Sequence, residues 1–234
     1  MVKRAVKPAP QQTDLFSKPR RVQVLIVDDH ELMREGLRML IGHEKNLEVC
    51  GEAGNQLEAQ QQFRRLQPDV VVVDLSLGDN SGLDLIKWIK LQQRVTKIVV
   101  STMHDERVYG ERVLRAGANG YVNKQDPART IIHAINRVLE GKLQFGEDLV
   151  NRVMFRAMSG SEPPNASPID NLSDRELEVF RLLGKGLSVQ VIAQKLHLTR
   201  STVDTYRERL KTKLAVKTSE DLVYRAINWC RQDT

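Results

Sequence analysis

The sequence has little of what membrane, secreted or metal-thiolate proteins need. Only two of its 234 residues are cysteines, Cys50 and Cys230, so neither a disulfide framework nor a cysteine metal site is indicated. No apolar run approaches the roughly 20 residues of a membrane-spanning helix, and no apolar segment of the signal-peptide type follows the basic N-terminus. We therefore expect a cytoplasmic protein with no membrane partner.

The chain carries a net charge of +6, and this charge is unevenly distributed. Residues 1–21 contain six Lys/Arg against one Asp, and residues 168–234 contain twelve against nine Asp/Glu, which leaves residues 22–167 with a net charge of −2. Hydrophobic residues make up 41% of the chain, which is ordinary for a protein with a buried core. The length favours two domains over one.

Residues 1–21 mix Pro, Gln and basic residues without apolar periodicity, which predicts a disordered basic tail. Short β-branched runs then alternate with amphipathic stretches over residues 22–140. The expected strands lie at 22–28, 47–53, 69–74, 96–102 and 119–124, and the expected helices at 31–42, 55–66, 82–91, 105–116 and 127–140. This alternation predicts an α/β domain with a flavodoxin-like, doubly wound, five-stranded parallel sheet.

A second domain is expected after a linker. Residues 141–170 contain one helical stretch, near 146–158, and then the Ser- and Pro-rich segment SGSEPPNASP. Residues 171–234 show only helical patterns, so they predict an all-α domain of four helices. Two of these helices flank a short turn at His197–Leu198, which is the pattern of a helix-turn-helix whose second helix enters the DNA major groove.

Polar residues gather where the expected strands end. Asp28 and Asp29 close the first strand, Asp74 the third, Thr102 the fourth and Lys124 the fifth. The C-terminal ends of parallel strands form one edge of the sheet, where such folds bind ligands. Three close carboxylates repel one another unless a divalent cation neutralises them, and oxygen ligands favour Mg²⁺. One carboxylate can then attack a phosphoryl group whose oxygens contact the ammonium and the hydroxyl.

The segments VDDH, VVVDLS, VVSTMHD and GYVNK resemble the receiver domain of two-component response regulators over about residues 22–140. The resemblance implies that a partner histidine kinase phosphorylates Asp74, and that Lys124 and Thr102 assist. It also implies that Thr102 and Tyr121 form the switch pair of the domain. The implied Mg²⁺ ligands are Asp28, Asp29, Asp74 and the backbone carbonyl of Ser76. After Asp74 many relatives have an apolar residue and a proline, whereas this chain has SLGDNSG.

The segments LSDRELEVFRLLGKG, IAQKLHLTRSTVDTY and LKTKLAV resemble the LuxR-type helix-turn-helix, which together with a receiver is typical of the NarL/FixJ family. This implies double-stranded DNA as a partner and a homodimer after phosphorylation. The candidate DNA-contacting residues are Arg200, Ser201, Thr202, Asp204, Thr205, Arg207, Glu208 and Lys211. The acidic Asp204 and Glu208 stand where the family commonly has basic residues, so we expect an altered base preference or weak affinity.

The predicted function is therefore that of a DNA-binding transcriptional response regulator, in which phosphorylation controls dimerisation or release of the recognition helix. A phosphohydrolase of the haloacid dehalogenase type would have a second Asp at position 76, where this chain has Ser, so no enzyme is expected. A phosphorylation-independent DNA-binding or protein-interaction module is the remaining alternative. The five histidines show no ligand spacing and are not expected to bind metal: His30, His43, His104, His133 and His197.

Overall fold

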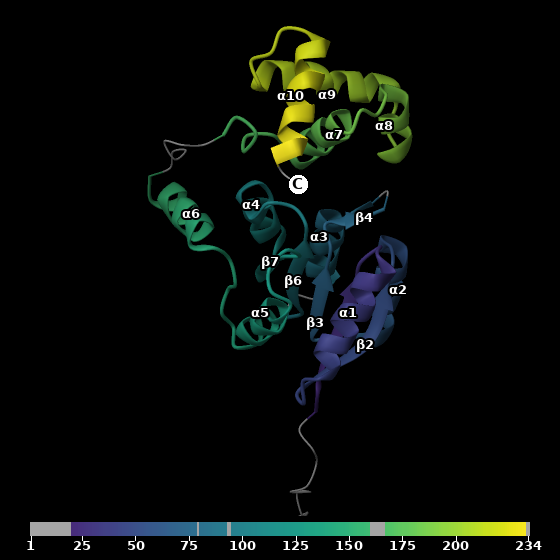
Figure 1. Ribbon diagram of the computed structural model, residues 1–234, viewed down its shortest axis with the longest axis vertical. Coiled ribbons are helices and arrows are strands. Elements are labelled where there is room, and N and C mark those ends of the chain that lie inside the picture. Colours follow the sequence, from purple (N-terminus) through teal and green to yellow (C-terminus); the bar gives the residue numbers. More distant parts are fainter. Residues whose placement is uncertain (1–19, 79, 93–94, 160–166, 233–234) are drawn as a thin grey trace, which may run out of the picture.

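The computed structural model describes residues 20–78, 80–92, 95–159 and 167–232. The expected basic tail up to residue 19, and residues 160–166 of the expected linker, lie outside this part of the chain. An α/β domain and a domain of four helices lie next to each other, and α6 lies beside them (Figure 1). No helix among the described residues is long and apolar enough to cross a membrane.

The central sheet has five parallel strands in the order β2-β1-β3-β6-β7. These strands are β1 (Val22–Val27), β2 (Leu47–Ala53), β3 (Val70–Val73), β6 (Lys97–Thr102) and β7 (Gly120–Asn123). The chain starts beside the centre of the sheet, adds one strand outward and then returns to add the other three. This order confirms the flavodoxin-like, doubly wound sheet.

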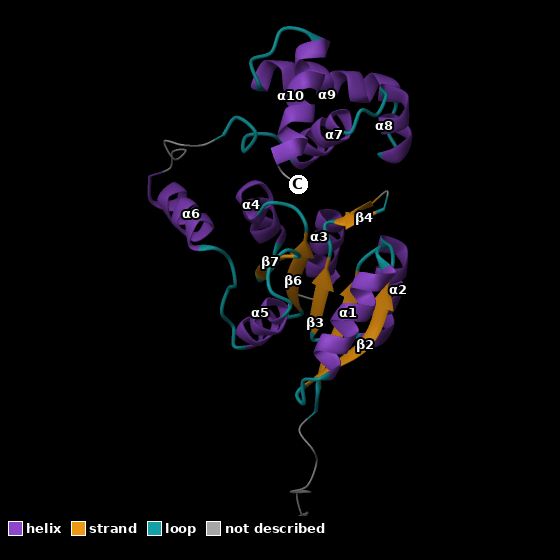
Figure 2. Cartoon of the chain, in the orientation of Figure 1, coloured by secondary structure: helices purple, strands orange, loops and turns teal. Residues whose placement is uncertain are grey.

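Five helices cover the two faces of the sheet (Figure 2). They are α1 (Glu31–Gly42), α2 (Gln56–Leu66), α3 (Gly82–Gln92), α4 (Glu106–Ala116) and α5 (Arg129–Leu139). Side chains of β1 alternate between the faces: Leu25 and Val27 pack with α2, α3 and α4, whereas Val24 and Ile26 pack with α1 and α5. Burial on both faces explains why the strands are almost continuous runs of β-branched residues.

The segment after β3 contains an element that the sequence did not predict. Two short strands, β4 (Ser76–Leu77) and β5 (Asn80–Ser81), form an antiparallel pair within SLGDNSG. Gly82 begins α3 directly behind them, and its amide donates to the carbonyl of Leu75. The segment SLGDNSG, which lacks the proline that many relatives have after this aspartate, thus forms a small hairpin between β3 and α3.

The second domain consists of α7 (Asp174–Gly184), α8 (Val189–Lys195), α9 (Arg200–Lys213) and α10 (Ser219–Gln232). Hydroxyl side chains cap three of them: Ser173 caps α7 in a capping box with Glu176, Ser188 caps α8 and Thr199 caps α9. The turn between α8 and α9 contains His197 at φ 52°, in the left-handed region. The predicted four-helix domain with a helix-turn-helix is confirmed.

Helix α6 (Glu147–Ser159) lies between the two domains in the sequence and packs against α4. Gly110 of α4 allows this approach, because a Cβ atom there would lie 2.8 Å from Leu149. The other face of α6 is exposed and carries Val150, Met154 and Met158 at helical spacing, with Phe155 beside them. Helix α6 therefore carries an apolar face that the α/β domain does not cover.

Candidate functional site

Three carboxylates meet at the C-terminal edge of the sheet. Asp28 and Asp29 follow β1, and Asp74 follows β3, whose last residue, Val73, pairs with Val27 of β1. Asp28 and Asp74 are 1% and 3% exposed, whereas Asp29 is more accessible. Ligand atoms of these three residues and His30 lie within 4.8 Å of one another. Hard oxygen donors in this arrangement suit Mg²⁺.

His30 is a member of this cluster that sequence reasoning set aside. Its Nδ1 lies 2.8 Å from a carboxylate oxygen of Asp29 and 3.3 Å from one of Asp28. The residue occupies the N-cap position of α1, directly after the two aspartates, and its amide donates to Asp28. The adjacency to Asp29 was the available signal, but the direction of the ring depends on how α1 begins.

Lys124 neutralises part of the acidic charge. Its Nζ lies 2.7 Å from Asp28 Oδ2 and 2.7 Å from Asp74 Oδ2, and its side chain is 5% exposed. Burial alone would lower the pKa of this ammonium, but the charge of Asp74 and the hydrogen bonds to Asp28 and Asp74 outweigh burial and raise the pKa. Lys124 is therefore held as a cation between the two buried carboxylates.

Thr102 and Tyr121 lie on neighbouring strands, β6 and β7. Thr102 is 1% exposed, and its hydroxyl oxygen has no hydrogen-bond partner among the described residues. A buried hydroxyl without a partner is costly, which suits a group that binds a further acceptor. Tyr121 is buried, and its hydroxyl donates to the carbonyl of His104 at 2.8 Å. Tyr121 thus ties β7 to the loop between β6 and α4.

The loop after Asp74 brings further residues to the site. The amide of Ser76 donates to Asp74 Oδ1 at 3.3 Å, and the Ser76 hydroxyl lies 3.0 Å from His104 Nε2. Gly82 lies directly against this loop, because a Cβ atom on it would come within 2.0 Å of the Asp74 carbonyl oxygen. Sequence reasoning missed the requirement for glycine here, because it arises from the close approach of two segments and leaves no local pattern.

The predicted DNA-contacting residues lie on α9 and differ in accessibility. Arg200, Ser201, Thr205 and Glu208 are exposed, and the other four predicted residues are half-buried: Thr202, Asp204, Arg207 and Lys211. The two acidic residues are paired on the same helix. Asp204 lies 2.9 Å from Arg207, and Glu208 lies 2.8 Å from Lys211. Each acid thus offsets a cation among the predicted DNA-contacting residues.

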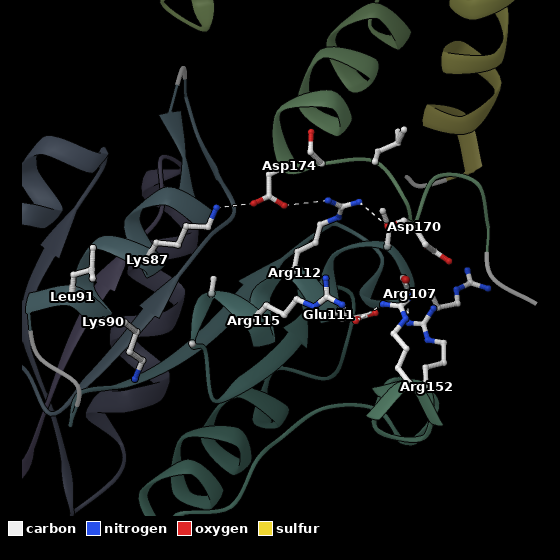
Figure 3. Close-up of a pocket in the computed structure, with 16 residues that line it drawn as sticks. Lys87, Lys90, Leu91, Arg107, Glu111, Arg112, Arg115, Arg152, Asp170 and Asp174 are labelled. Carbon is white, nitrogen blue, oxygen red and sulfur yellow. Dashed lines mark hydrogen bonds and ion pairs between the residues drawn. The ribbon is translucent and has the colours of Figure 1, made fainter. Parts of the chain in front are cut away.

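The two domains contact each other through α7, which lies against α3 and α4. Asp174, the first residue of α7, binds Lys87 of α3 at 2.7 Å and Arg112 of α4 at 3.1 Å (Figure 3). Burial alone would raise the pKa of Asp174, but the hydrogen bonds and charges of Lys87 and Arg112 outweigh burial and lower the pKa. Tyr109 of α4 packs against the apolar cores of both domains.

One residue of the helical domain reaches the loop after Asp74. The Arg181 guanidinium, on α7, lies 3.3 Å from the Ser76 hydroxyl and 3.2 Å from His104 Nε2. Ser76 contacts Asp74, and the backbone of His104 is held by Tyr121. Arg181 therefore joins the helical domain to two segments, one of which contacts Asp74 and the other Tyr121.

Comparison with known proteins agrees with this arrangement. Residues 24–136 match the response regulator receiver domain, and residues 170–226 match the bacterial regulatory proteins of the luxR family. The chain is 34% identical over 207 residues to the response regulator UvrY of Escherichia coli (strain K12), over 88% of this chain and 94% of UvrY. It is 32% identical over 211 residues to the oxygen regulatory protein NreC of Staphylococcus epidermidis, over 88% of this chain and 97% of NreC.

Solved structures are similar over both domains. The RcsB response regulator of Salmonella typhimurium superposes with a TM-score of 0.70 at 26% identity, covering 92% of this chain and 99% of RcsB. RcsB of Salmonella enterica serovar Typhimurium, bound to promoter P1flhDC in the presence of the phosphomimetic BeF3−, superposes with a TM-score of 0.67 at 26% identity, covering 88% and 98%. The chain belongs to the NarL/FixJ family of two-component response regulators, with a receiver domain and a LuxR-type DNA-binding domain.

Proposed function

We propose that Asp74 accepts a phosphoryl group from a partner histidine kinase, and that this modification controls binding of the chain to double-stranded promoter DNA. The observation that carries the proposal is the Thr102 hydroxyl, which is buried without a partner among the described residues. Thr102 ends β6, the strand next to β3, and Asp74 directly follows β3. A phosphoryl oxygen on Asp74 would supply the acceptor that this hydroxyl lacks.

In the transfer, a carboxylate oxygen of Asp74 attacks phosphorus while the bond between phosphorus and the kinase histidine breaks. The histidine nitrogen leaves with the electron pair of that bond and takes up a proton. Asp28, Asp29, Asp74 and the backbone carbonyl of Ser76 would hold Mg²⁺, which when bound offsets repulsion between the carboxylate and the phosphoryl oxygens. Lys124, already within 2.7 Å of Asp74, pairs with a phosphoryl oxygen. The chain is thus a regulator that is modified, and not an enzyme with a separate substrate.

The contact of Arg181 with Ser76 and His104 supports a link between this chemistry and the DNA-binding domain. A phosphoryl group on Asp74 recruits Thr102 and the loop after Asp74, and these movements displace the Ser76 and His104 side chains. Arg181 then loses two acceptors, and the docking of α7 on α3 and α4 weakens. Phosphorylation thereby shifts the equilibrium from the docked arrangement to an open one.

Between the two predicted outputs, the accessibility of α9 favours dimerisation over release of the recognition helix. Ser201, Thr205 and Glu208 are exposed while α7 is docked on the receiver. Docking therefore leaves these three predicted DNA-contacting side chains accessible. Phosphorylation is therefore better placed to control whether two copies of the chain associate. Two recognition helices are needed to match the spacing of two half-sites on DNA.

The exposed face of α6 supports a second copy as the partner. Val150, Met154, Phe155 and Met158 are between 40% and 86% exposed, and they form one apolar face. Such a face is costly in water and gains from pairing with an identical face across a two-fold axis. Opening of the domains would move α7 away from α4, against which α6 packs, and leave more room for a second copy beside this face.

The experiment measures oligomeric state and DNA affinity of the full chain with and without beryllofluoride and Mg²⁺. Light scattering and fluorescence anisotropy with a duplex enriched from genomic fragments provide the two readouts. We expect beryllofluoride to increase both dimer fraction and affinity in the unaltered chain and to change neither in Asp74→Asn. Unchanged dimer fraction and affinity in the unaltered chain would refute control by phosphorylation.

Arg181→Ala tests the link between the domains. We expect this variant to dimerise and bind DNA more strongly than the unaltered chain before any beryllofluoride is added, because the docked arrangement has lost a contact. Arg231→Ala, which removes the same charge from an exposed position of α10, is the control and should behave like the unaltered chain. Equal behaviour of Arg181→Ala and Arg231→Ala would exclude Arg181 as the coupling residue.

A phosphorylation-independent DNA binder is the second candidate, and the exposure of Ser201, Thr205 and Glu208 in the docked arrangement favours it. In that case the unaltered chain and Asp74→Asn bind the enriched duplex equally well with and without beryllofluoride. The anisotropy titration above therefore separates the two functions.

A further inference from the structure

A cleft of about 880 Å³ lies at the junction of the receiver, α6 and the segment that leads into α7 (Figure 3). Its walls are formed by α3, α4, α6 and residues 170–174. None of the residues proposed for phosphoryl transfer lines it, and none of the predicted DNA-contacting residues does. The cleft is therefore a separate feature of the molecule.

The walls of the cleft carry more cations than anions. The lining cations are Lys87, Lys90, Arg107, Arg112, Arg115, Arg152 and Arg156, and the lining anions are Glu111, Asp170 and Asp174. Two of the carboxylates each form ion pairs with two cations. Glu111 binds both Arg115 and Arg156, and Asp174 binds both Lys87 and Arg112. Lys90 lines the cleft mainly with the aliphatic part of its side chain, because its ammonium donates a hydrogen bond to the Thr96 carbonyl.

Two of these cations are shielded from solvent. The Arg112 and Arg156 side chains are 11% and 19% exposed, whereas those of Arg107 and Arg115 are 76% and 68% exposed. The Nε of Arg152 is buried and has no hydrogen-bond partner among the described residues, although its Nη2 donates to the Arg107 carbonyl. Cations that gather in a half-enclosed space repel one another more strongly than in water. An anion in the cleft would offset this repulsion and accept a hydrogen bond from the Arg152 guanidinium.

We propose that this cleft binds a small phosphorylated anion of the pyrophosphate or nucleoside diphosphate class. Guanidinium groups recognise phosphate oxygens through paired N–H donors, and four arginines of α4 and α6 are close enough to line one space: Arg107, Arg115, Arg152 and Arg156. The volume lies within the range of roughly 300–1,000 Å³ that is usual for small-molecule sites. Val108 and Leu172 add apolar contacts for an organic portion of the ligand.

The position of the cleft gives the ligand a regulatory effect. The site includes receiver residues of α3 and α4 together with residues 170–174 next to α7, so it is complete only while α7 is docked. A ligand that binds one arrangement better than another shifts the population toward it. The bound anion therefore stabilises the docked arrangement and opposes opening. This effect on opening rests on the proposed function, whereas binding itself does not.

Isothermal titration calorimetry of the full chain with pyrophosphate, and separately with ADP, tests the site. The buffer contains EDTA and constant KCl so that Mg²⁺ and ionic strength do not vary. We expect saturable binding of one molecule per chain for at least one of the two probes. The double variant Arg115→Ala/Arg152→Ala should lose affinity by at least about tenfold, since it removes two charge-assisted contacts. Arg65→Ala, which removes an arginine of α2 outside the cleft, should change affinity by less than about twofold.

Three outcomes of the calorimetry would overturn the site. The first is the absence of saturable heat for both probes, and the second is an equal affinity in the double variant and in Arg65→Ala. The third is equally tight binding of sulfate, which would indicate charge screening alone. If the double variant instead weakens binding of every duplex to the same extent, the arginines contact DNA and the assignment is wrong. Asp74→Asn should bind the probe as the unaltered chain does, so a failure of phosphorylation control leaves the calorimetric result intact.

Discussion

The acidic edge of the receiver sheet and the recognition helix both concentrate charge, but they do so by different physical means. At the sheet edge, Asp28, Asp74 and Lys124 come from three different strand ends and are almost fully buried. On α9, Asp204 and Arg207 come from adjacent turns of one helix and remain partly accessible. The first arrangement depends on the register of a five-stranded sheet, and the second depends only on helical spacing.

This difference determines how each region responds to change. A buried charge that loses its partner is left without solvation, which is costly. An exposed pair on a helix is replaced by water and ions, at a cost of only a few tenths of a kcal/mol. Substitutions at the receiver edge should therefore be poorly tolerated, whereas single substitutions on the recognition helix should each have a small effect on stability.

The largest expected effect is the loss of phosphorylation in Asp74→Asn. The amide cannot act as the nucleophile, so incubation with acetyl phosphate and Mg²⁺ should yield no modified protein on phosphate-affinity gels. Asp148→Asn, on the exposed side of α6, is the matched control and should be modified like the unaltered chain. Continued modification of Asp74→Asn would place the phosphoryl group on another residue.

A glycine beside the acidic edge should be nearly as sensitive. In Gly82→Ala the new Cβ would lie 2.0 Å from the Asp74 carbonyl oxygen, so the loop after β3 must move. We expect urea unfolding to show a loss of roughly 2–3 kcal/mol for the receiver, together with slower phosphorylation.

Gly36→Ala, within α1, is the control for that measurement. A Cβ atom at Gly36 meets nothing within 4 Å, so this variant should be as stable as the unaltered chain or up to about 1 kcal/mol more stable. If both alanine variants have the same free energy of unfolding, the contact between Gly82 and Asp74 does not constrain the loop.

On the recognition helix, Asp204→Lys should strengthen non-specific DNA binding. The change removes an anion, adds a cation and frees Arg207 for phosphate, so the slope of log affinity against log salt should steepen by about 1 to 2. Anisotropy titrations at several KCl concentrations measure this slope. Glu220→Lys makes the same charge change on α10 and should alter the slope less. An unchanged slope in Asp204→Lys would show that position 204 does not approach DNA.

The smallest expected effect on stability, and the one that separates stability from function, comes from Thr102→Val. The buried hydroxyl has no partner to lose among the described residues, so the free energy of unfolding should stay constant or rise by up to about 1 kcal/mol. Dimerisation induced by beryllofluoride should nevertheless weaken.

Thr96→Val provides the contrast, because the equally buried Thr96 hydroxyl donates to the Pro68 carbonyl at 3.1 Å. Its removal leaves that carbonyl without a partner and should cost roughly 1 kcal/mol. An equal loss of stability in both valine variants would contradict the unsatisfied state of the Thr102 hydroxyl.

Much of the fold follows from local patterns. The runs of valine and isoleucine indicated five strands, and the helical patterns of residues 171–234 indicated an all-α second domain. The strand-end positions of Asp28, Asp74 and Lys124 also predicted that these side chains would meet, because parallel strands end at one edge. The short β4–β5 pair was not predictable, since two-residue strands have no periodicity.

The sequence by itself therefore determined the two domain types, the five parallel strands and five helices of the receiver, and the acidic edge of the sheet, because these depend on periodicity and strand order. Only the tertiary structure decided that Arg181 reaches Ser76, that Gly82 must lack a side chain, and that arginines of α4 and α6 line one cleft. These features join residues distant in the sequence through the packing of helices and domains. Such packing depends on the shapes of whole surfaces, which no local pattern encodes.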